Sequence, residues 1–313
     1  MSIEWWILIA ALAQFINAVV AILDKYIVSD EQALPRPFVY AFYSCLITGF
    51  WVIIYFIGFL PGLSLFGVPK FSNVQSPTIE IVALSFLSAY TFFMALVSMY
   101  DGLKRSSAST VMPIIGAVSG VSAFVMNHLF LGVRLSENFI WGVLLLSVGT
   151  LLIAQSLPKR GEFVHIIHSG IFFALHYISM KGLFNATSFD DGFFWSRIGF
   201  VLFALSLLMV PAYWDKIKEQ TTQTTKKTGV IVVMTKVLAG IAAFMLLKAT
   251  AAGDVAVVQS TDGLKFVFII IIATVFSAWI PESASEQESR PNQIIQKLLS
   301  IAVIVIGFFI LFT

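Results

Sequence analysis

Charged side chains are scarce in this sequence. Only 12% of its 313 residues are Asp, Glu, Lys or Arg, whereas 58% are hydrophobic. Ordinary globular domains carry roughly 25% charged residues, because water must wet their surface. So few charges cannot cover a water-soluble particle of this length. We therefore predict that a lipid bilayer surrounds most of the protein.

Cysteine and histidine are also rare, and nucleotide-binding loops are missing. Cys45 is the only cysteine, which excludes a disulfide framework and a thiolate metal site. The four histidines are scattered, and His168 and His176 have no third ligand at helical spacing. No Gly-x-x-x-x-Gly-Lys loop occurs, so nucleotide hydrolysis is not the energy source. We expect no metal, no other cofactor, no nucleic-acid partner and no catalytic cluster.

Long apolar segments fill most of the chain. A helix that crosses the hydrocarbon core needs about 20 apolar residues, and its backbone must satisfy its own hydrogen bonds. An outer-membrane barrel would show alternating segments of about ten residues instead. We therefore predict an all-α integral membrane protein with ten transmembrane helices. The ten apolar windows are 4–28, 38–60, 78–99, 107–131, 138–156, 164–183, 192–213, 229–249, 254–279 and 294–312.

The two halves of the chain resemble each other. A shift of 156 residues places Lys25 on Lys181 and aligns apolar residues around them. Each half holds five windows, and an odd number of helices gives the two halves opposite orientations in the membrane. We predict two inverted five-helix repeats, residues 1–156 and 157–313. Secondary transporters built in this way place their substrate near the midplane, between the halves.

Basic residues are distributed unevenly between the links. Cytoplasmic loops are enriched in Lys and Arg, so the asymmetry predicts a multi-pass protein of the cell (inner) membrane with both termini outside the cytoplasm. The links after helices 1, 3, 5, 7 and 9 hold twelve basic residues: Lys25, Arg36, Lys104, Arg105, Lys159, Arg160, Lys216, Lys218, Lys226, Lys227, Arg290 and Lys297. The links after helices 2, 4, 6 and 8 hold four: Lys70, Arg134, Lys181 and Lys248.

Predicted helices 3 to 5 carry a family motif. Ser107-Ala108-Ser109, Met112-Pro113-Ile114-Ile115 and Leu131-Gly132-Val133-Arg134-Leu135-Ser136 together resemble the EamA-type repeat of the drug/metabolite transporter superfamily. That repeat opens a helix with small residues, continues to a proline, and closes with Leu-Gly-Glu-X-Leu-Ser. The resemblance implies two five-helix units and a transport function. It also implies termini in the cytoplasm, which is opposite to the orientation that the basic residues predict.

The second half resembles a diverged copy of this motif. Ala251-Ala252-Gly253-Asp254 opens the ninth predicted helix, and Ile280-Pro281-Glu282-Ser283 closes it. Two positions depart from the family pattern. Val133 stands where a glutamate is usual, and Gln259 falls roughly where the second copy usually has a proline.

The sequence favours a secondary-active transporter that moves a small organic metabolite by alternating access. A proton or solute gradient would drive it. The alternatives are a lipid-linked substrate translocase, a channel and, least favoured, an intramembrane enzyme. An exchanger of lipophilic cations, as in the small multidrug resistance proteins, is disfavoured because helix 1 has acids only at its ends, Glu4 and Asp24.

Three cations inside the apolar windows are the main candidates for substrate binding. An ionisable side chain at mid-bilayer costs roughly 2.5 kcal/mol or more, so Arg197, Lys236 and Lys265 need an explanation. Asp262 precedes Lys265 by three positions and is close enough on a helix to pair with it. We predict that Lys265 binds an anionic or strongly polar group of the substrate. The alternatives are an Asp262–Lys265 pair that is only structural, a Lys236 paired with an acid from another helix, and an Arg197 that snorkels to the interface.

Polar and aromatic side chains complete the predicted site. On helix 1 a polar stripe faces inward, and Asp24-Lys25 at its end is interpreted as an interfacial anchor. The alternative role of the polar side chains is hydrogen bonding between packed helices, and that of the aromatic side chains is packing or contact with lipid. The further substrate-binding candidates are Gln14, Asn17, Tyr43, Tyr90, His176 and Tyr177.

Overall fold

The regular structure is helical throughout the part of the chain that the computed structural model describes. That part comprises residues 4–29, 36–57, 68–106, 108–154, 160–223, 225–275 and 291–312. The longer helices are α1 (Trp5–Ser29), α2 (Pro37–Phe50), α4 (Ile79–Arg105), α5 (Ala108–Leu131), α6 (Glu137–Ile153), α7 (Arg160–Ala186), α8 (Phe189–Leu207), α9 (Pro211–Gln223), α10 (Lys226–Ala252), α12 (Asp262–Val275) and α13 (Pro291–Ile310). The short helices are η1 (Trp51–Ile53), α3 (Ile54–Ile57), η3 (Phe71–Asn73) and α11 (Val255–Ser260).

The predicted all-α membrane architecture is confirmed, and each of the ten windows contains helix. Within the described ranges, seven spans are long and apolar enough to cross a bilayer, and the bent pair α8–α9 makes an eighth candidate. Helices α6 and α13 are apolar but contribute shorter segments. The count of ten complete spans is therefore not confirmed. The predicted repeat boundary between 156 and 157, Ser107 and the motif at 280–283 lie outside the described residues.

Three windows are interrupted rather than continuous. Helix α2 gives way to a turn of 3₁₀ helix at Trp51, and α11 and α12 are separate helices divided at Thr261. The window 192–213 was predicted as one helix, but α8 ends at Leu207 and α9 leaves it at 97°. Pro211 suits the first position of a helix because it has no N–H to donate.

Helix α9 packs across the end of α2. The ring of Tyr213 lies 4.8 Å from that of Phe38, and Ile217 is buried beneath the helix. Arg36 Nη1 lies 2.6 Å from Glu219 Oε2, in an ion pair whose partners are largely exposed. The hydrogen bond between these two side chains lowers the pKa of Glu219 and raises the pKa of Arg36. The polar link after predicted helix 7 thus contains an ordered surface helix.

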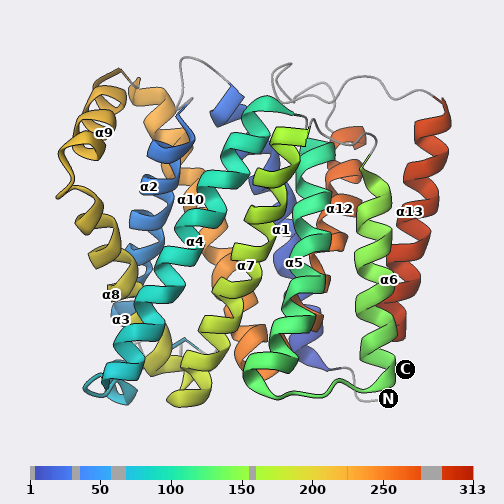
Figure 1. The fold of residues 1–313 in the computed structure, drawn as a ribbon, viewed down its shortest axis with the longest axis horizontal. Helices are drawn as coiled ribbons and strands as arrows, with labels where there is room; N and C mark the ends of the chain where they lie inside the picture. The colour runs from blue at the N-terminus through green and yellow to red at the C-terminus, as the bar shows by residue number, and fades with distance from the viewer. Residues whose placement is uncertain are drawn as a thin grey trace.

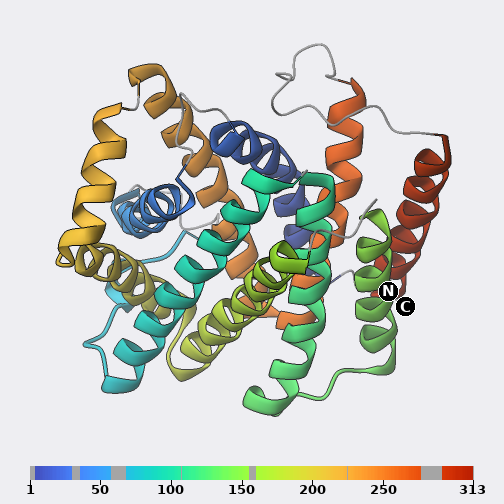
Figure 2. The same ribbon diagram turned by 45° about the horizontal axis from the view of Figure 1, so that its top comes forward.

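The bundle is organised by contacts between the two halves of the chain (Figures 1 and 2). Helix α1 packs on α10 and α4 packs on α7, while α2 packs on α8, α5 on α11 and α6 on α13. Glycine allows two of these pairs to approach closely. A Cβ at Gly49 of α2 would lie 3.0 Å from the carbonyl oxygen of Arg197 in α8. A Cβ at Gly307 of α13 would lie 2.9 Å from the backbone nitrogen of Leu146 in α6.

Two lysines that the 156-residue shift aligns occupy corresponding places. Lys25 Nζ donates to the carbonyl oxygens of Leu103 (2.7 Å) and Ser106 (3.2 Å), at the C-terminal end of α4. Lys181 Nζ donates to three carbonyl oxygens at 2.9–3.1 Å, at the C-terminal end of α10. Both ammonium groups satisfy helix-end carbonyls that have no partner within their helix. The ends of α4 and α10 lie at opposite edges of the bundle (Figure 1).

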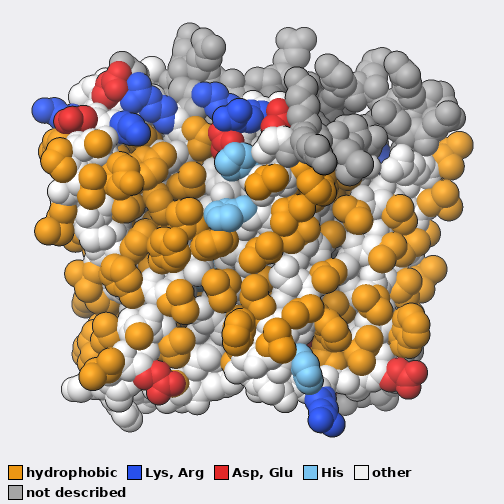
Figure 3. Space-filling view, viewed as in Figure 1, with side chains coloured by type: hydrophobic (Ala, Val, Ile, Leu, Met, Phe, Trp, Pro, Cys, Tyr) orange, Lys and Arg blue, Asp and Glu red, His pale blue; other side chains and the backbone are white. Residues whose placement is uncertain are grey.

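The outer surface is apolar between two polar edges. Figure 3 shows hydrophobic side chains across the middle of the visible face, with most Lys and Arg side chains along the upper edge. The two termini lie at the lower edge (Figure 1). On this face most basic side chains and the two termini therefore lie at opposite edges of the bundle.

Cysteine substituted at Thr222 tests which side faces the cytoplasm. Thr222 is exposed on α9, and Cys45 is buried, so the unmodified chain serves as the unlabelled control. We expect Thr222→Cys to resist an impermeant thiol reagent in intact cells and to react after permeabilisation, because basic loops stay in the cytoplasm. Labelling in intact cells would instead support cytoplasmic termini.

Candidate functional site

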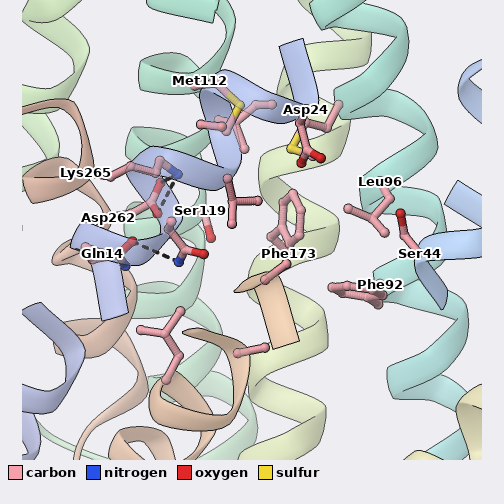
Figure 4. A pocket seen from close by; sticks show the side chains of 18 of the residues that line it. Gln14, Asp24, Ser44, Phe92, Leu96, Met112, Ser119, Phe173, Asp262 and Lys265 are labelled. Atoms are coloured by element: carbon pink, nitrogen blue, oxygen red, sulfur yellow. Dashed lines mark hydrogen bonds and ion pairs between the residues drawn. The ribbon is translucent and has the colours of Figure 1, made fainter. Parts of the chain in front are cut away.

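A cavity of about 150 Å³ lies between the two halves of the chain. Its wall is formed by α1, α2, α4 and α5 from the first half and by α7, α10, α11 and α12 from the second. Figure 4 shows Gln14, Asp262 and Lys265 on one side, and Ser44, Leu96 and Phe92 on the other. Most of the lining is apolar, so each polar group in it is an exception that needs a partner.

Six of the ten predicted site residues line this cavity. They are Gln14, Asn17, Tyr177, Lys236, Asp262 and Lys265. Asn17 Nδ2 donates to Gln14 Oε1 at 3.2 Å, one turn away on α1. The polar stripe of helix 1 therefore faces the inside of the bundle. Its amides retain further donors and acceptors, because each amide offers two N–H groups and a carbonyl oxygen.

The predicted pair on α12 is formed. Lys265 Nζ lies 2.7 Å from Oδ1 and 2.8 Å from Oδ2 of Asp262, so the ammonium contacts both carboxylate oxygens. The break at Thr261 places this pair in the first turn of α12, beside the cavity. The charge of Lys265 is therefore balanced within its own helix. This removes one reason for expecting an anionic partner at Lys265, although the pair remains on the cavity wall.

A second ion pair joins the two halves. Lys236 Nζ of α10 lies 2.8 Å from Asp24 Oδ1 of α1, and both side chains are at most 6% exposed. Tyr40 donates its hydroxyl to the same carboxylate oxygen, and Lys236 Nζ lies 2.8 Å from the hydroxyl oxygen of Tyr100. The ammonium also lies 4.1 Å from the centre of the Tyr40 ring, within reach of a cation–π attraction.

This pair corrects two interpretations of the sequence. Asp24 was predicted to anchor helix 1 at the interface, but it is buried and its partners come from α2 and α10. Lys236 was one of the cations without an evident partner, and it is paired with an acid from another helix. That alternative could be stated from the sequence. The identity of the acid could not, because Asp24 and Lys236 are 212 residues apart.

Arg197 and His176 lie outside the cavity lining. Arg197 is 2% exposed, so it does not snorkel to the interface. His176 Nδ1 lies 3.0 Å from the hydroxyl oxygen of Ser88, and its ring packs on Phe92. His176 is thus buried beside a polar partner, and it does not line the cavity.

The two remaining candidates, Tyr43 and Tyr90, also lie away from the cavity. The hydroxyl of Tyr43 contacts the hydroxyl of Thr221 on α9, and Tyr90 is 42% exposed on the outer surface. Aromatic rings are as acceptable to lipid as to a cavity, so residue type alone did not fix their direction. Conversely, Ser119 is not among the predicted site residues, although its hydroxyl donates to Gln259 Oε1 at 3.0 Å in the cavity wall. The sequence marks Gln259 only as a departure from the family pattern.

Comparisons with known proteins give a family match and a similar solved structure. The search of curated proteins gave no match. A solved structure described as "Crystal structure of protein" has a TM-score of 0.60 at 14% identity, over 96% of this chain and 95% of that one. This similarity shows the fold alone. Residues 4–155 match the model of the EamA-like transporter family. The predicted EamA resemblance is thereby confirmed over residues 4–155, which are similar to the EamA-like transporter family.

Proposed function

We propose that this membrane protein is a secondary carrier of small solutes that works by alternating access, with its substrate bound in the cavity between the halves. The match of residues 4–155 to the EamA-like transporter family supports the transport of small solutes and a non-enzymatic role. The observation that carries the mechanism is the position of the cavity. Helices of both halves line it, so a movement of one half against the other would change its access to either side of the membrane.

Two inverted repeats, residues 1–156 and 157–313, are part of this proposal. The contacts of Lys25 at the end of α4 and of Lys181 at the end of α10 support it, because corresponding residues act at opposite edges of the bundle. The helix pairing supports it too. The contact of α1 with α10 corresponds to the contact of α7 with α4 when the halves are exchanged. We count ten membrane helices on this basis.

The cavity favours a small polar organic metabolite. Two ion pairs and the amides of Gln14 and Asn17 supply hydrogen-bonding groups within an otherwise apolar wall. Small-molecule sites commonly combine an apolar lining with a few placed polar groups. The Asp24–Lys236 pair contributes one residue from each half, so a solute that perturbs it would couple binding to the packing of α1 on α10. A proton or solute gradient would supply the driving force.

Counterflow in proteoliposomes tests the carrier mechanism. Purified protein is reconstituted in vesicles loaded with an unlabelled metabolite, and uptake of the same labelled compound is followed. A carrier gives saturable uptake that is stimulated by the internal compound. A channel gives uptake without saturation or stimulation. A lipid-linked substrate translocase would give no uptake of the soluble compound. It would instead expose a labelled lipid on the opposite leaflet.

Asn17→Leu is expected to reduce transport by about tenfold or more while the protein remains folded and inserted. The substitution removes one or two hydrogen bonds to a polar solute, each costing about 1 kcal/mol or more when its partner stays buried. Leucine is well tolerated in lipid, so protein level and thermal stability should change little. Unaltered counterflow by Asn17→Leu would assign Gln14 and Asn17 to helix packing.

A further inference from the structure

One buried cation in the described part of the bundle has no carboxylate partner. Lys236 pairs with Asp24, and Lys265 pairs with Asp262. Arg197 forms no ion pair with any described residue, although it is only 2% exposed. Guanidinium groups keep their proton in proteins. Among the buried cations of the described bundle, Arg197 therefore differs from Lys236 and Lys265 in having no paired acid.

The acid closest to Arg197 along α8 is occupied elsewhere. Asp191 Oδ1 accepts the backbone N–H of Gln75 at 2.9 Å, and its other carboxylate oxygen contacts the hydroxyl of Thr187. These contacts hold Asp191 at the N-terminal end of α8, where a negative charge is favourable. The carboxylate is therefore committed to that helix end and to the segment before α4.

The donors of Arg197 are poorly used. Its Nε lies 3.3 Å from the hydroxyl of Ser196 and its Nη1 lies 3.4 Å from the carbonyl oxygen of Thr48, both long contacts. Its Nη2 has no hydrogen-bond partner among the described residues. The rings of Phe193 and Phe200, 4.6 and 4.7 Å from the guanidinium carbon, cover it. An unused donor on a buried charge is costly, so an additional acceptor would be bound favourably.

Arg197 lies one residue behind the cavity wall. Thr48, which accepts its Nη1 hydrogen bond, lines the cavity. Phe92 also lines the cavity, and its ring lies 5.2 Å from that of Phe200, which covers the guanidinium. In Figure 4, Phe92 and Ser44 are on the side of the cavity away from Asp262 and Lys265. A solute between these sides would have the neutral pair at one end and the guanidinium behind the wall at the other.

The wall beside Arg197 is also a point where the backbone changes. Helix α2 ends at Phe50 and continues as 3₁₀ helix, two residues after Thr48. A shift of α2, or a rotation of the Phe92 side chain, would place the guanidinium in contact with the cavity. The planar fork of arginine matches the two oxygens of a carboxylate, which gives strong and directional hydrogen bonds.

We infer that Arg197 receives the anionic group of the solute during the transport cycle, and that the transported compound is a small carboxylate. The inference rests on the proposed carrier function and deepens it. It also moves the anion-binding role from Lys265, whose charge Asp262 balances, to the cation that lacks such a partner. Arg197 reaches the solute after Thr48 or Phe92 has moved aside.

Thermal unfolding of the purified full-length protein tests this assignment. The probes are a panel of small carboxylates, each measured beside its primary amide at constant ionic strength. We expect at least one carboxylate to raise the melting temperature and its amide not to do so. Arg197→Gln should weaken the apparent affinity for that carboxylate by about tenfold or more, and Arg197→Lys should weaken it less. Lys181→Gln, which removes a cation at a helix end, should leave the affinity unchanged.

Three results would overturn the assignment. They are a panel in which no carboxylate stabilises the protein, amides that stabilise it equally, and an Arg197→Gln variant with full affinity. If Arg197→Gln does not fold, the carboxylate affinities of the wild type, Arg197→Lys and Lys181→Gln still test the assignment. An Arg197→Lys variant with full affinity would then overturn it. Counterflow separates this inference from the carrier proposal. Exchange of the carboxylate at normal rate by Arg197→Gln would refute the anion site only, whereas carboxylate binding without counterflow would refute the carrier only.

Discussion

Asp24→Asn and Lys236→Met are each expected to abolish transport and to lower the free energy of unfolding by about 3–5 kcal/mol. Either change leaves a buried charge without its partner, in a network that also contains Tyr40 and Tyr100. The loss of stability is measured by thermal or denaturant unfolding in detergent. The loss of transport is measured by counterflow.

The exposed pair Arg36–Glu219 is the matched control for this experiment. It also joins two helical segments through one ion pair, at 2.6 Å, but water screens it. Glu219→Gln should therefore change stability and transport little. The double variant Asp24→Asn with Lys236→Met should recover part of the stability, because no uncompensated charge remains, but not the transport. Equal effects of Asp24→Asn and Glu219→Gln would rule out a structural role for the buried pair.

Gly49→Ala is expected to lower stability by about 1–3 kcal/mol or more, the usual range for overpacking a well-packed interface. Its Cβ would lie 2.6 Å from Val201 Cγ2 and 2.9 Å from the backbone nitrogen of the same residue. Rotation of a side chain cannot relieve the contact with the α8 backbone, so α2 must move away. Arg197 and Thr48 belong to the same contact between α2 and α8, so transport should fall as well.

Gly182→Ala provides the matched control on α7. The nearest atoms to its added Cβ, both from Leu84, are 3.9 Å away, which is ordinary contact distance. Alanine is favoured over glycine inside a helix by roughly 0.5–1 kcal/mol. Gly182→Ala should therefore be neutral or slightly stabilising in the same unfolding assay. A destabilisation similar to that of Gly49→Ala would show that helix glycines in this bundle are sensitive wherever they occur, independently of close approach.

The helices could be predicted from the sequence because each depends on a local property. A run of apolar residues is sufficient to place α1 or α10, since lipid requires the backbone to bond within the segment. The interruptions were harder to predict. The break at Trp51 and the division at Thr261 occur inside apolar sequence, where composition does not change. The turn into α9 had a local signal in Pro211, but its 97° angle depends on packing against α2.

The site was predictable to the extent that its contacts are local. The spacing of Asp262 and Lys265 places them on one helix face, and their ion pair is formed. The partner of Lys236 depends on how α1 packs against α10, which no spacing along the chain encodes. The location of Tyr90 could not be predicted for a different reason. An aromatic side chain is compatible both with lipid and with a cavity, so its residue type does not indicate which of the two it faces.

The contact between α6 and α13 imposes an order on biosynthesis. Gly149 and Leu146 of α6 pack against α13, so that face of α6 has its native neighbour only after α13 has been made. Some 157 residues separate the end of α6 at Ile153 from the end of α13 at Ile310. Ribosomes add about 5–20 residues per second, so α6 waits for roughly 8–30 s. During that interval lipid or an insertion factor must cover this surface, and a prematurely truncated chain would leave it open to a second copy.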